Sequence, residues 1–324
     1  MIESILLAVT RVSTFQGEQG LSGATGFFFE RDDRLYVVTN RHVVFDEPSG
    51  HRPDRIELEL HVDAENATVV QPFPVPLYDE SGKSRWKQGV DSQGEVDVAV
   101  LELDRAALPE TLVYRPFTPH HMVEELDEIE VGASLLVVGF PLGFHDDMHH
   151  LPVARRSAIA SSFGMRFQGK GYFLHDARTH RGTSGAPVVA RMSLQRGRRT
   201  LPWTLLGVHA SRLDVTRDLE QDEALGLNCA WYADIILTLT DPAAEIAPAP
   251  AAAAGTPVAN APAPAPAAVA PAPAPVVAPT PVPAPAIALD APRPKAPAAE
   301  VAPAAPVTPT PATPVPKPAA TAKP

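Results

Sequence analysis

The chain has 324 residues, a formal net charge of −11 and no arginine-rich segment or basic stripe, which argues against nucleic acid as a partner. Its single cysteine, Cys229, excludes an intrachain disulfide and favours a reducing compartment. The N-terminal segment lacks a basic region and a cleavage site, and no apolar run approaches the roughly 20 residues that span a membrane. These features predict a cytoplasmic protein with no membrane partner.

Short β-branched runs, separated by turn-forming residues, fill most of the first 240 positions. Several alternate apolar with polar residues, as in "RIELELHV" at 55–62, which is the period of a half-buried strand. Helical spacing appears only at 120–129 and at 233–241. The pattern predicts an all-β sandwich or barrel with strands at 4–12, 25–30, 34–40, 55–62, 96–103, 133–140, 156–163, 185–192 and 203–211.

The composition changes at about residue 241, since 25 of the 37 prolines follow Thr240. A segment of Pro, Ala, Val and Thr cannot bury enough apolar surface to offset the entropy of ordering it. Residues 241–324 are therefore predicted to be a disordered Pro/Ala-rich tail. It would act as a spacer or as a polyproline ligand, and alternating Ala-Pro carries little specificity, which favours the spacer.

The segment "GTSGAPVV" at 182–189 fits a tight turn that enters a buried strand, and it also fits the nucleophile loop of a hydrolase. A serine hydroxyl needs a neighbouring base, most often histidine, to become a nucleophile at neutral pH. His42 in "LYVVTNRHVV" follows a predicted strand directly, which gives the imidazole a rigid mount. Taken on its own, a histidine in this setting is more often a surface loop residue than a catalytic base.

A third residue, a carboxylate, must orient such a histidine. Asp97 opens the predicted strand "VDVAVLEL" in phase with apolar neighbours, where a carboxylate is costly unless it has a partner. Taken on its own, a strand-start aspartate that bonds to a turn explains Asp97 equally well. Asp91 and Glu95 belong to the preceding polar loop and fit less well.

The order His42, Asp97, Ser184 and the texts around them resemble the trypsin-like serine peptidases, in motif style the bacterial Deg-type branch, without a PDZ domain. "TGFFFE…LYVVTNRHVV", "DVAVLEL", "LLVVGFPLGF" and "HDARTHRGTSGAPVV" carry this resemblance over about residues 20–240. It implies a chymotrypsin-like fold of two six-stranded antiparallel Greek-key barrels, at about 1–115 and 125–240, with little helix.

The resemblance implies a serine endopeptidase that acts on peptide or protein substrates without a cofactor. Ser184 would be the nucleophile, His42 the base and Asp97 the orienting acid. The backbone N–H groups of Gly182 and Ser184 would form the oxyanion hole. The alternative is a latent or inactive protease-fold module that binds or scaffolds partners in a larger complex.

Two positions depart from the family pattern. Ala186 stands where a second glycine is usual, and Thr183 stands where digestive members carry the aspartate that pairs with a newly cut N-terminus. Activation by such a cut is therefore not expected. In the Deg-type branch the loop before the serine switches between ordered and disordered states, and residues 175–181 correspond to that loop.

By the resemblance, "GVHAS" at 207–211 corresponds to the strand that pairs with substrate, and residues near Arg178 correspond to the pocket floor. Arg178, His209 and Ser211 are therefore assigned to the substrate pocket. Arg178 and His209 would favour an acidic or polar P1 side chain if they face the pocket, and the alternative is that they face solvent. The histidine-rich segment "FHDDMHH" at 144–150 fits no familiar zinc spacing. It is interpreted as a solvated loop, so no metal site is expected.

Overall fold

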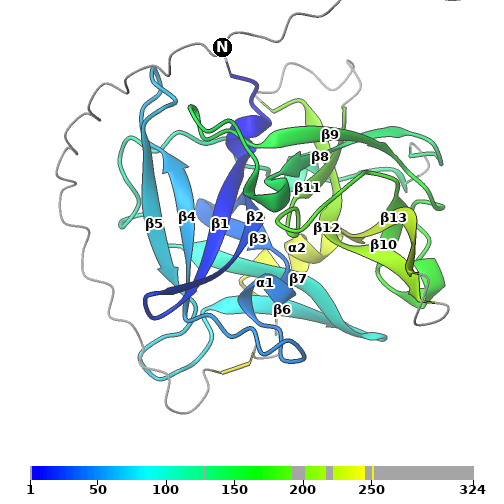
Figure 1. Cartoon of the computed structure of the whole chain (residues 1–324), viewed down its shortest axis with the longest axis horizontal. Coiled ribbons are helices and arrows are strands. Elements are labelled where there is room, and N and C mark those ends of the chain that lie inside the picture. The colour runs from blue at the N-terminus through cyan, green and yellow to red at the C-terminus, as the bar shows by residue number, and fades with distance from the viewer. Residues whose placement is uncertain (1, 127–128, 192–200, 217–221, 245–249, 252–324) are drawn as a thin grey trace, which may run out of the picture. The chain divides into compact units, whose positions relative to one another are not determined.

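The computed structural model describes residues 2–126, 129–191, 201–216, 222–244 and 250–251. Thirteen strands and two short α-helices account for most of the regular structure in these residues (Figure 1). The first half of the chain contributes β1 (Val9–Gln16), β2 (Gln19–Arg31), β3 (Arg34–Thr39), α1 (Arg41–Val44), β4 (Arg55–His61), β5 (Val70–Pro76), β6 (Trp86–Asp91) and β7 (Gly94–Leu103). The second half contributes β8 (Ser134–Gly139), β9 (Val153–Ala158), β10 (Tyr172–His175), β11 (Pro187–Arg191), β12 (Trp203–Thr216), β13 (Asp222–Tyr232) and α2 (Asp234–Thr240).

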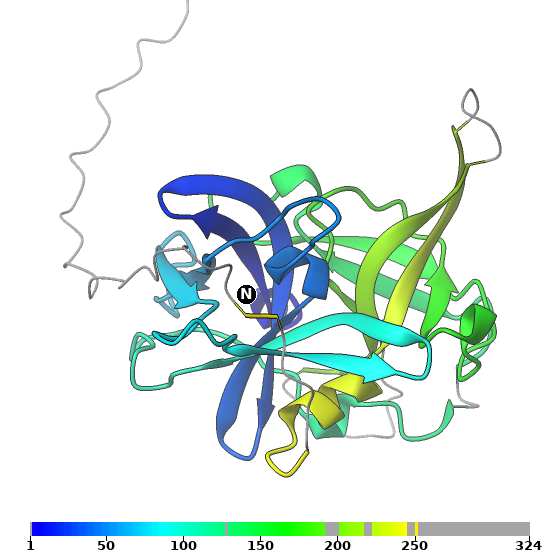
Figure 2. The ribbon, with the colours of Figure 1, turned by 90° about the horizontal axis from the view of Figure 1, so that it is seen from below.

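The strands form two antiparallel sheets, which confirms the all-β prediction. The first sheet has seven strands in the order β5-β4-β1-β2-β3-β7-β6, and the second has six in the order β10-β13-β12-β11-β8-β9. Seen from below, the first-half and second-half strands form two separate groups that meet along one seam (Figure 2). The prediction of six strands for each barrel is met in the second sheet and exceeded by one in the first.

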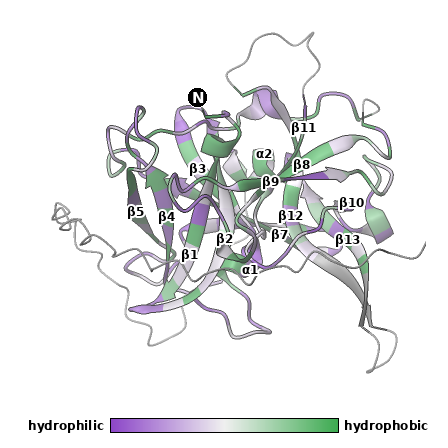
Figure 3. Cartoon of the chain, turned by 45° about the horizontal axis from the view of Figure 1, so that its top comes forward, coloured by the Kyte–Doolittle hydropathy of each residue, from purple (hydrophilic) through white to green (hydrophobic). Residues whose placement is uncertain are grey.

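The strand β5 explains part of this difference. It contains Pro72, Pro74 and Pro76, and proline within a run argues against a strand because it cannot donate to the ladder. β5 lies at the edge of its sheet and pairs only with β4, so each proline nitrogen is tolerated. β4 itself shows the expected alternation of less buried and buried residues, and the hydropathy colour changes along the strand in Figure 3.

The two predicted helices have opposite outcomes. The one at 233–241 is confirmed as α2, whose Ile236 and Leu239 are fully buried. The one at 120–129 is wrong where the structure describes it, because a 3₁₀ turn forms at Pro119–His121 and residues 122–125 are not helical; residues 127–128 lie outside the described residues. Met122 is instead buried and forms an isolated parallel bridge with Leu205 of β12.

One apolar cluster joins the two halves, and others lie within each sheet. Each sheet encloses its own core, and a further cluster joins residues of both sheets to α2 and to the 3₁₀ turn Leu6–Ala8. Arg31 of β2 donates to the Leu237 carbonyl and pairs with Asp241, which fastens the end of α2 to the first sheet. Residues 252–324, most of the predicted tail, lie outside the described residues.

No helix in the described part of the chain is long and apolar enough to cross a membrane.

Candidate active site

The pairing of β3 with β7 places His42 beside Asp97. The two strands are antiparallel with Thr39 opposite Ala99, so the turn after β3 meets the start of β7. Asp97 accepts two bonds from the same residue, from the His42 backbone N–H at 2.9 Å and from the ring Nδ1–H at 2.8 Å. This double contact fixes both the position of the histidine and its tautomer, leaving Nε2 free of the proton.

The electrostatics of this pair suit a general base. Burial alone lowers the pKa of His42, but the hydrogen bond and the negative charge of Asp97 outweigh it and raise that pKa above its ordinary value. The His42 side chain keeps 36% of its surface exposed, so the imidazole stays accessible from solution. Asp91 and Glu95, the alternatives to Asp97, pair instead with Arg166 and Arg41.

Asn40 supports the pair and was not identified from the sequence. It is fully buried, and its Nδ2 donates to the Asp97 carbonyl at 2.7 Å. The residue therefore links the β3–α1 turn to the main chain of β7. The sequence signal for such a link is an asparagine at the end of an apolar strand, directly before Arg41 and His42, because a polar side chain placed there needs a hydrogen-bond partner.

Two glycines give the nucleophile loop its shape. Gly182 has φ +89° and Gly185 has φ +84°, both in the region that side chains rarely adopt. A Cβ on Gly182 would lie 2.4 Å from the Phe140 carbonyl oxygen, and one on Gly185 would lie 2.1 Å from the Thr25 carbonyl oxygen. The loop thus packs main chain against main chain on both sides of Ser184.

Thr25 of β2 joins this loop to the first sheet, and it too was missed from the sequence. Its Oγ1 donates to the Gly182 carbonyl at 2.7 Å and accepts from the Phe140 N–H at 3.1 Å. Its own N–H donates to the Ser184 carbonyl at 2.9 Å. The nucleophile loop of the second sheet is therefore fastened to β2, which pairs with β3, the strand that leads into the His42 turn.

The peptide between Arg181 and Gly182 has a defined direction. The Arg181 carbonyl accepts a hydrogen bond from the Leu142 N–H at 2.5 Å. Because a trans peptide is planar, its N–H points away from its carbonyl, so the Gly182 N–H faces away from Leu142. Within the described residues neither the Gly182 nor the Ser184 N–H is donated to another backbone group. Two donors of one loop are thus left available.

The Ser184 hydroxyl donates to the Ala210 carbonyl of β12 at 3.3 Å rather than to His42. Catalytic hydrogen bonds are often long or misaligned without substrate, and attack would require the hydroxyl to turn from Ala210 toward His42. The departures noted in the sequence are accommodated, because Ala186 is fully buried and Thr183 is nearly so. The Thr183 Oγ1 lacks a hydrogen-bond partner among the described residues.

The three tentative pocket residues have different surroundings. His209 is buried at 2% exposure, whereas Arg178 and Ser211 are exposed. The solvent-facing alternative is therefore wrong for His209. Ser211 lies on the wall of a hollow of about 270 Å³ that also includes Asp97 and Ala210, directly beside the His42 pair. Arg178 is not among the residues that line this hollow.

His209 belongs to a buried histidine pair. The Ala177 N–H donates to His175 Nδ1 at 3.3 Å, so His175 carries its proton on Nε2 and donates to His209 Nδ1 at 3.1 Å. Burial lowers the pKa of His175 to about 4 and that of His209 well below its ordinary value. Both imidazoles are therefore neutral at pH 7 and supply no positive charge to the pocket.

The segment at 175–181 is anchored at several points. Asp176 accepts from the Ala158 N–H at 2.7 Å and from the Ser157 hydroxyl at 3.0 Å. Thr179 is buried and bonds to Asn228 of β13. These contacts hold the loop in the conformation described above.

Comparison with known proteins identifies the family. The model of the trypsin-like peptidase domain matches residues 24–193, which include His42, Asp97 and Ser184. Among curated proteins no sequence matches.

Solved structures with a similar chain trace include proteases of the HtrA type. AlgW with a tripeptide is 18% identical with a TM-score of 0.44, and the match covers 72% of this chain and 58% of that chain. The active form of the Rv3671c protease from M. tuberculosis is 16% identical with a TM-score of 0.44, covering 77% of this chain and 86% of that one. The match thus spans little more than half of the AlgW chain. By the family match, which includes more than half of its residues, the chain belongs to the trypsin-like peptidase domain family.

Proposed function

We propose that this protein is a serine endopeptidase that cleaves peptide bonds through an acyl-enzyme intermediate. Ser184 is the nucleophile, His42 is the general base and Asp97 orients the imidazole. The N–H groups of Gly182 and Ser184 bind the oxyanion. Peptide and protein substrates are the class that this chemistry implies.

The observation that carries the proposal is the double hydrogen bond from His42 to Asp97. A carboxylate that receives both the main chain and the ring of one histidine holds the Nε2 lone pair in one direction. The raised pKa of His42 favours acceptance of a proton in that direction. Thr25, through its bonds to Gly182 and Ser184, sets the nucleophile loop against the same sheet.

The reaction follows from these positions. Ser184 Oγ attacks the substrate carbonyl carbon as its proton passes to His42 Nε2, and the carbonyl oxygen becomes an oxyanion bound by two N–H groups. The C–N bond then breaks, with His42 giving its proton to the leaving amine. Water, deprotonated by His42, attacks the ester and releases the second product and Ser184.

A paired variant tests the assignment. Ser184→Ala should abolish peptide hydrolysis and labelling by a fluorophosphonate probe, while circular dichroism and the thermal midpoint stay unchanged. Ser81→Ala, on an exposed turn, is the matched control and should keep both activities. Hydrolysis that persists in Ser184→Ala would refute the proposal.

A latent or scaffolding module is the second candidate, because the Ser184 hydroxyl points to the Ala210 carbonyl. The same probe separates the two. If the folded protein does not react with the fluorophosphonate probe, even with a peptide bound, the latent or scaffolding module is favoured.

The substrate pocket gives a prediction about P1. Since His175 and His209 are neutral, an acidic preference would depend on Arg178, which is exposed. A peptide library varied at P1 measures the preference, and Arg178→Gln should abolish it. A clear preference for Val or Ala in the wild type would contradict an acidic pocket.

A further inference from the structure

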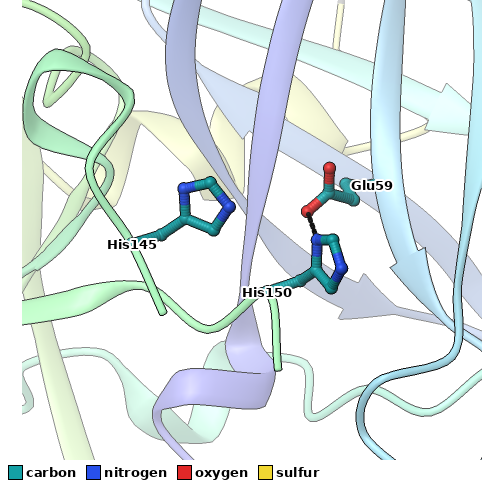
Figure 4. Close-up of side chains that lie close together, drawn as sticks. All are labelled: Glu59, His145 and His150. Carbon is teal, nitrogen blue, oxygen red and sulfur yellow. Dashed lines mark hydrogen bonds and ion pairs between the residues drawn. The ribbon is translucent and has the colours of Figure 1, made fainter. Parts of the chain in front are cut away.

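Three side chains from two distant segments meet on the side of the first sheet (Figure 4). Glu59 belongs to β4, while His145 and His150 belong to the loop between Gly143 and β9. One ligand atom from each residue lies within 4.8 Å of the others. All three side chains are partly buried rather than fully exposed. The segment 144–150, expected to be a solvated loop, is thus folded back onto a strand of the other sheet.

The hydrogen bonds orient the two imidazoles for coordination. His145 Nδ1 bonds to the Gly143 carbonyl at 2.6 Å, which places its proton on Nδ1 and leaves the lone pair of Nε2 free. Figure 4 shows one nitrogen of the His145 ring turned toward the other two residues. His150 Nδ1 bonds to Glu59 Oε1 at 2.9 Å. A backbone carbonyl behind a histidine is the usual outer partner of a metal-binding imidazole.

We propose that Glu59, His145 and His150 form a binding site for a divalent transition metal of the zinc class. Two imidazoles and one carboxylate are a ligand set that zinc accepts, and imidazole disfavours calcium and magnesium. The metal would take the place of the proton shared by His150 and Glu59. The sequence carries no signal for this site, because Glu59 lies 86 residues (145−59) before the nearer of its two histidine partners.

A fourth ligand is available nearby. The Asp147 carboxylate lies 3.6 Å from His145 Nε2 and its side chain is 96% exposed, so it is free to turn toward the metal. Water is the alternative fourth ligand. Arg11 is a further charged group close to the cluster, and its guanidinium lies 3.9 Å from Glu59 Oε2. Its charge opposes a dication, and displacement of Arg11 from Glu59 is part of the cost of binding.

The loop that carries the two histidines also touches the nucleophile loop. Leu142 donates to the Arg181 carbonyl, and Gly143, which accepts from His145, comes next in the chain. A metal that fixes His145 and His150 to β4 would restrain the loop that orients the Gly182 N–H. This consequence for hydrolysis depends on the proposed function, whereas the binding site itself does not.

Titration with ZnCl₂ by isothermal calorimetry, on the full chain, tests the site. We expect wild type to bind one equivalent of Zn²⁺. In Glu59→Gln and in His145→Gln the affinity for Zn²⁺ should fall by more than the roughly 10–100-fold that is typical when an outer partner is lost. His149→Gln, in the same loop but outside the cluster, is the matched control and should bind like wild type. CaCl₂ and MgCl₂ should give no saturable heat.

Two further readouts keep the result interpretable. CoCl₂ should give a visible absorption band in wild type and His149→Gln but not in His145→Gln. Zinc bound instead by His42 and Asp97 would still be bound by Glu59→Gln, His145→Gln and His149→Gln. Binding that remains in all three variants therefore identifies that other site. Equal isotherms for wild type, Glu59→Gln and His145→Gln, or no heat in folded wild type, would overturn the site. Metal binding is measured without reference to hydrolysis. The result of the Ser184→Ala test therefore does not affect the test of the metal site, and either proposal can fail alone.

Discussion

At the scale of single residues, Asp97 has two roles in the candidate site. It holds the His42 main chain through one oxygen and the His42 ring through the other. The first contact positions the residue, and the second sets the tautomer and stabilises the imidazolium that would form. The effect on the pKa of His42 therefore depends on a carboxylate that also shapes the backbone.

Asp97→Asn is expected to lower kcat by about 10⁴-fold, as in comparable triads, because the amide stabilises the wrong tautomer. The pKa of His42 should fall once the negative charge is removed, since the charge and hydrogen bond of Asp97 are what raise it. The acidic limb of the pH–rate profile of kcat/KM should therefore move to lower pH. An unchanged acidic limb would show that another group titrates there.

At the scale of elements, one strand of the first sheet shapes a loop of the second. The Thr25 side chain in β2 donates to the Gly182 carbonyl and accepts from the Phe140 N–H, so it joins the nucleophile loop to the segment that follows β8. A Cβ on Gly139 would lie 2.6 Å from Thr25 Oγ1, so this part of the interface has no spare volume. The nucleophile loop is thus positioned across the seam between the sheets.

Thr25→Val keeps the shape of the side chain but removes its hydroxyl. The buried Phe140 N–H and the partly buried Gly182 carbonyl then lose their partner, and the buried group alone costs about 1–3 kcal/mol. Where the turn shifts, kcat should fall by up to about 10²–10³-fold, the loss typical of one missing oxyanion donor. Thr25→Ser retains the hydroxyl and is the matched control. Equal kcat values for the two variants, measured with one peptide substrate, would contradict this account.

At the scale of the whole molecule, the buried histidine pair links stability to pH. His175 and His209 lie in the second sheet and their pKa values are lowered by burial, that of His175 to about 4. Unfolding exposes both to water, where the pKa of a histidine is about 6.5. Between these values the unfolded chain binds more protons than the folded one, so acid favours unfolding.

The free energy of unfolding should therefore fall as pH drops below about 6.5, by up to about 1.4 kcal/mol per pH unit for each histidine. His42, with its raised pKa, acts with the opposite sign and only above that pH. Urea unfolding between pH 5 and 8 measures the slope, and His175→Gln should reduce it. A flat profile between pH 5 and 6.5 in wild type would show that the pair is not buried and neutral in solution.

Much of the architecture follows from local patterns in the sequence. Alternation along segments such as 55–62 predicts strands because the buried face of a sheet repeats every second residue, and the family match supports the trypsin-like assignment. Glycine at 182 and 185 predicts a loop with special backbone angles, which the structure shows. The strand at Val70–Pro76 was not predicted, because proline within a strand is tolerated mainly at a sheet edge, and the position of a strand at the edge is a property of the assembled sheet.

The sequence by itself determined most of the strands, the composition of the tail and which serine, histidine and aspartate to examine, but it did not indicate β5, β6, β10 or β13. Only the tertiary structure decided what surrounds them: the anchoring by Asn40 and Thr25, the neutral His175–His209 pair, and the meeting of Glu59 with His145 and His150. Period and spacing report contacts within one element. Contacts between residues far apart in the chain depend on how two sheets pack, which no local pattern records.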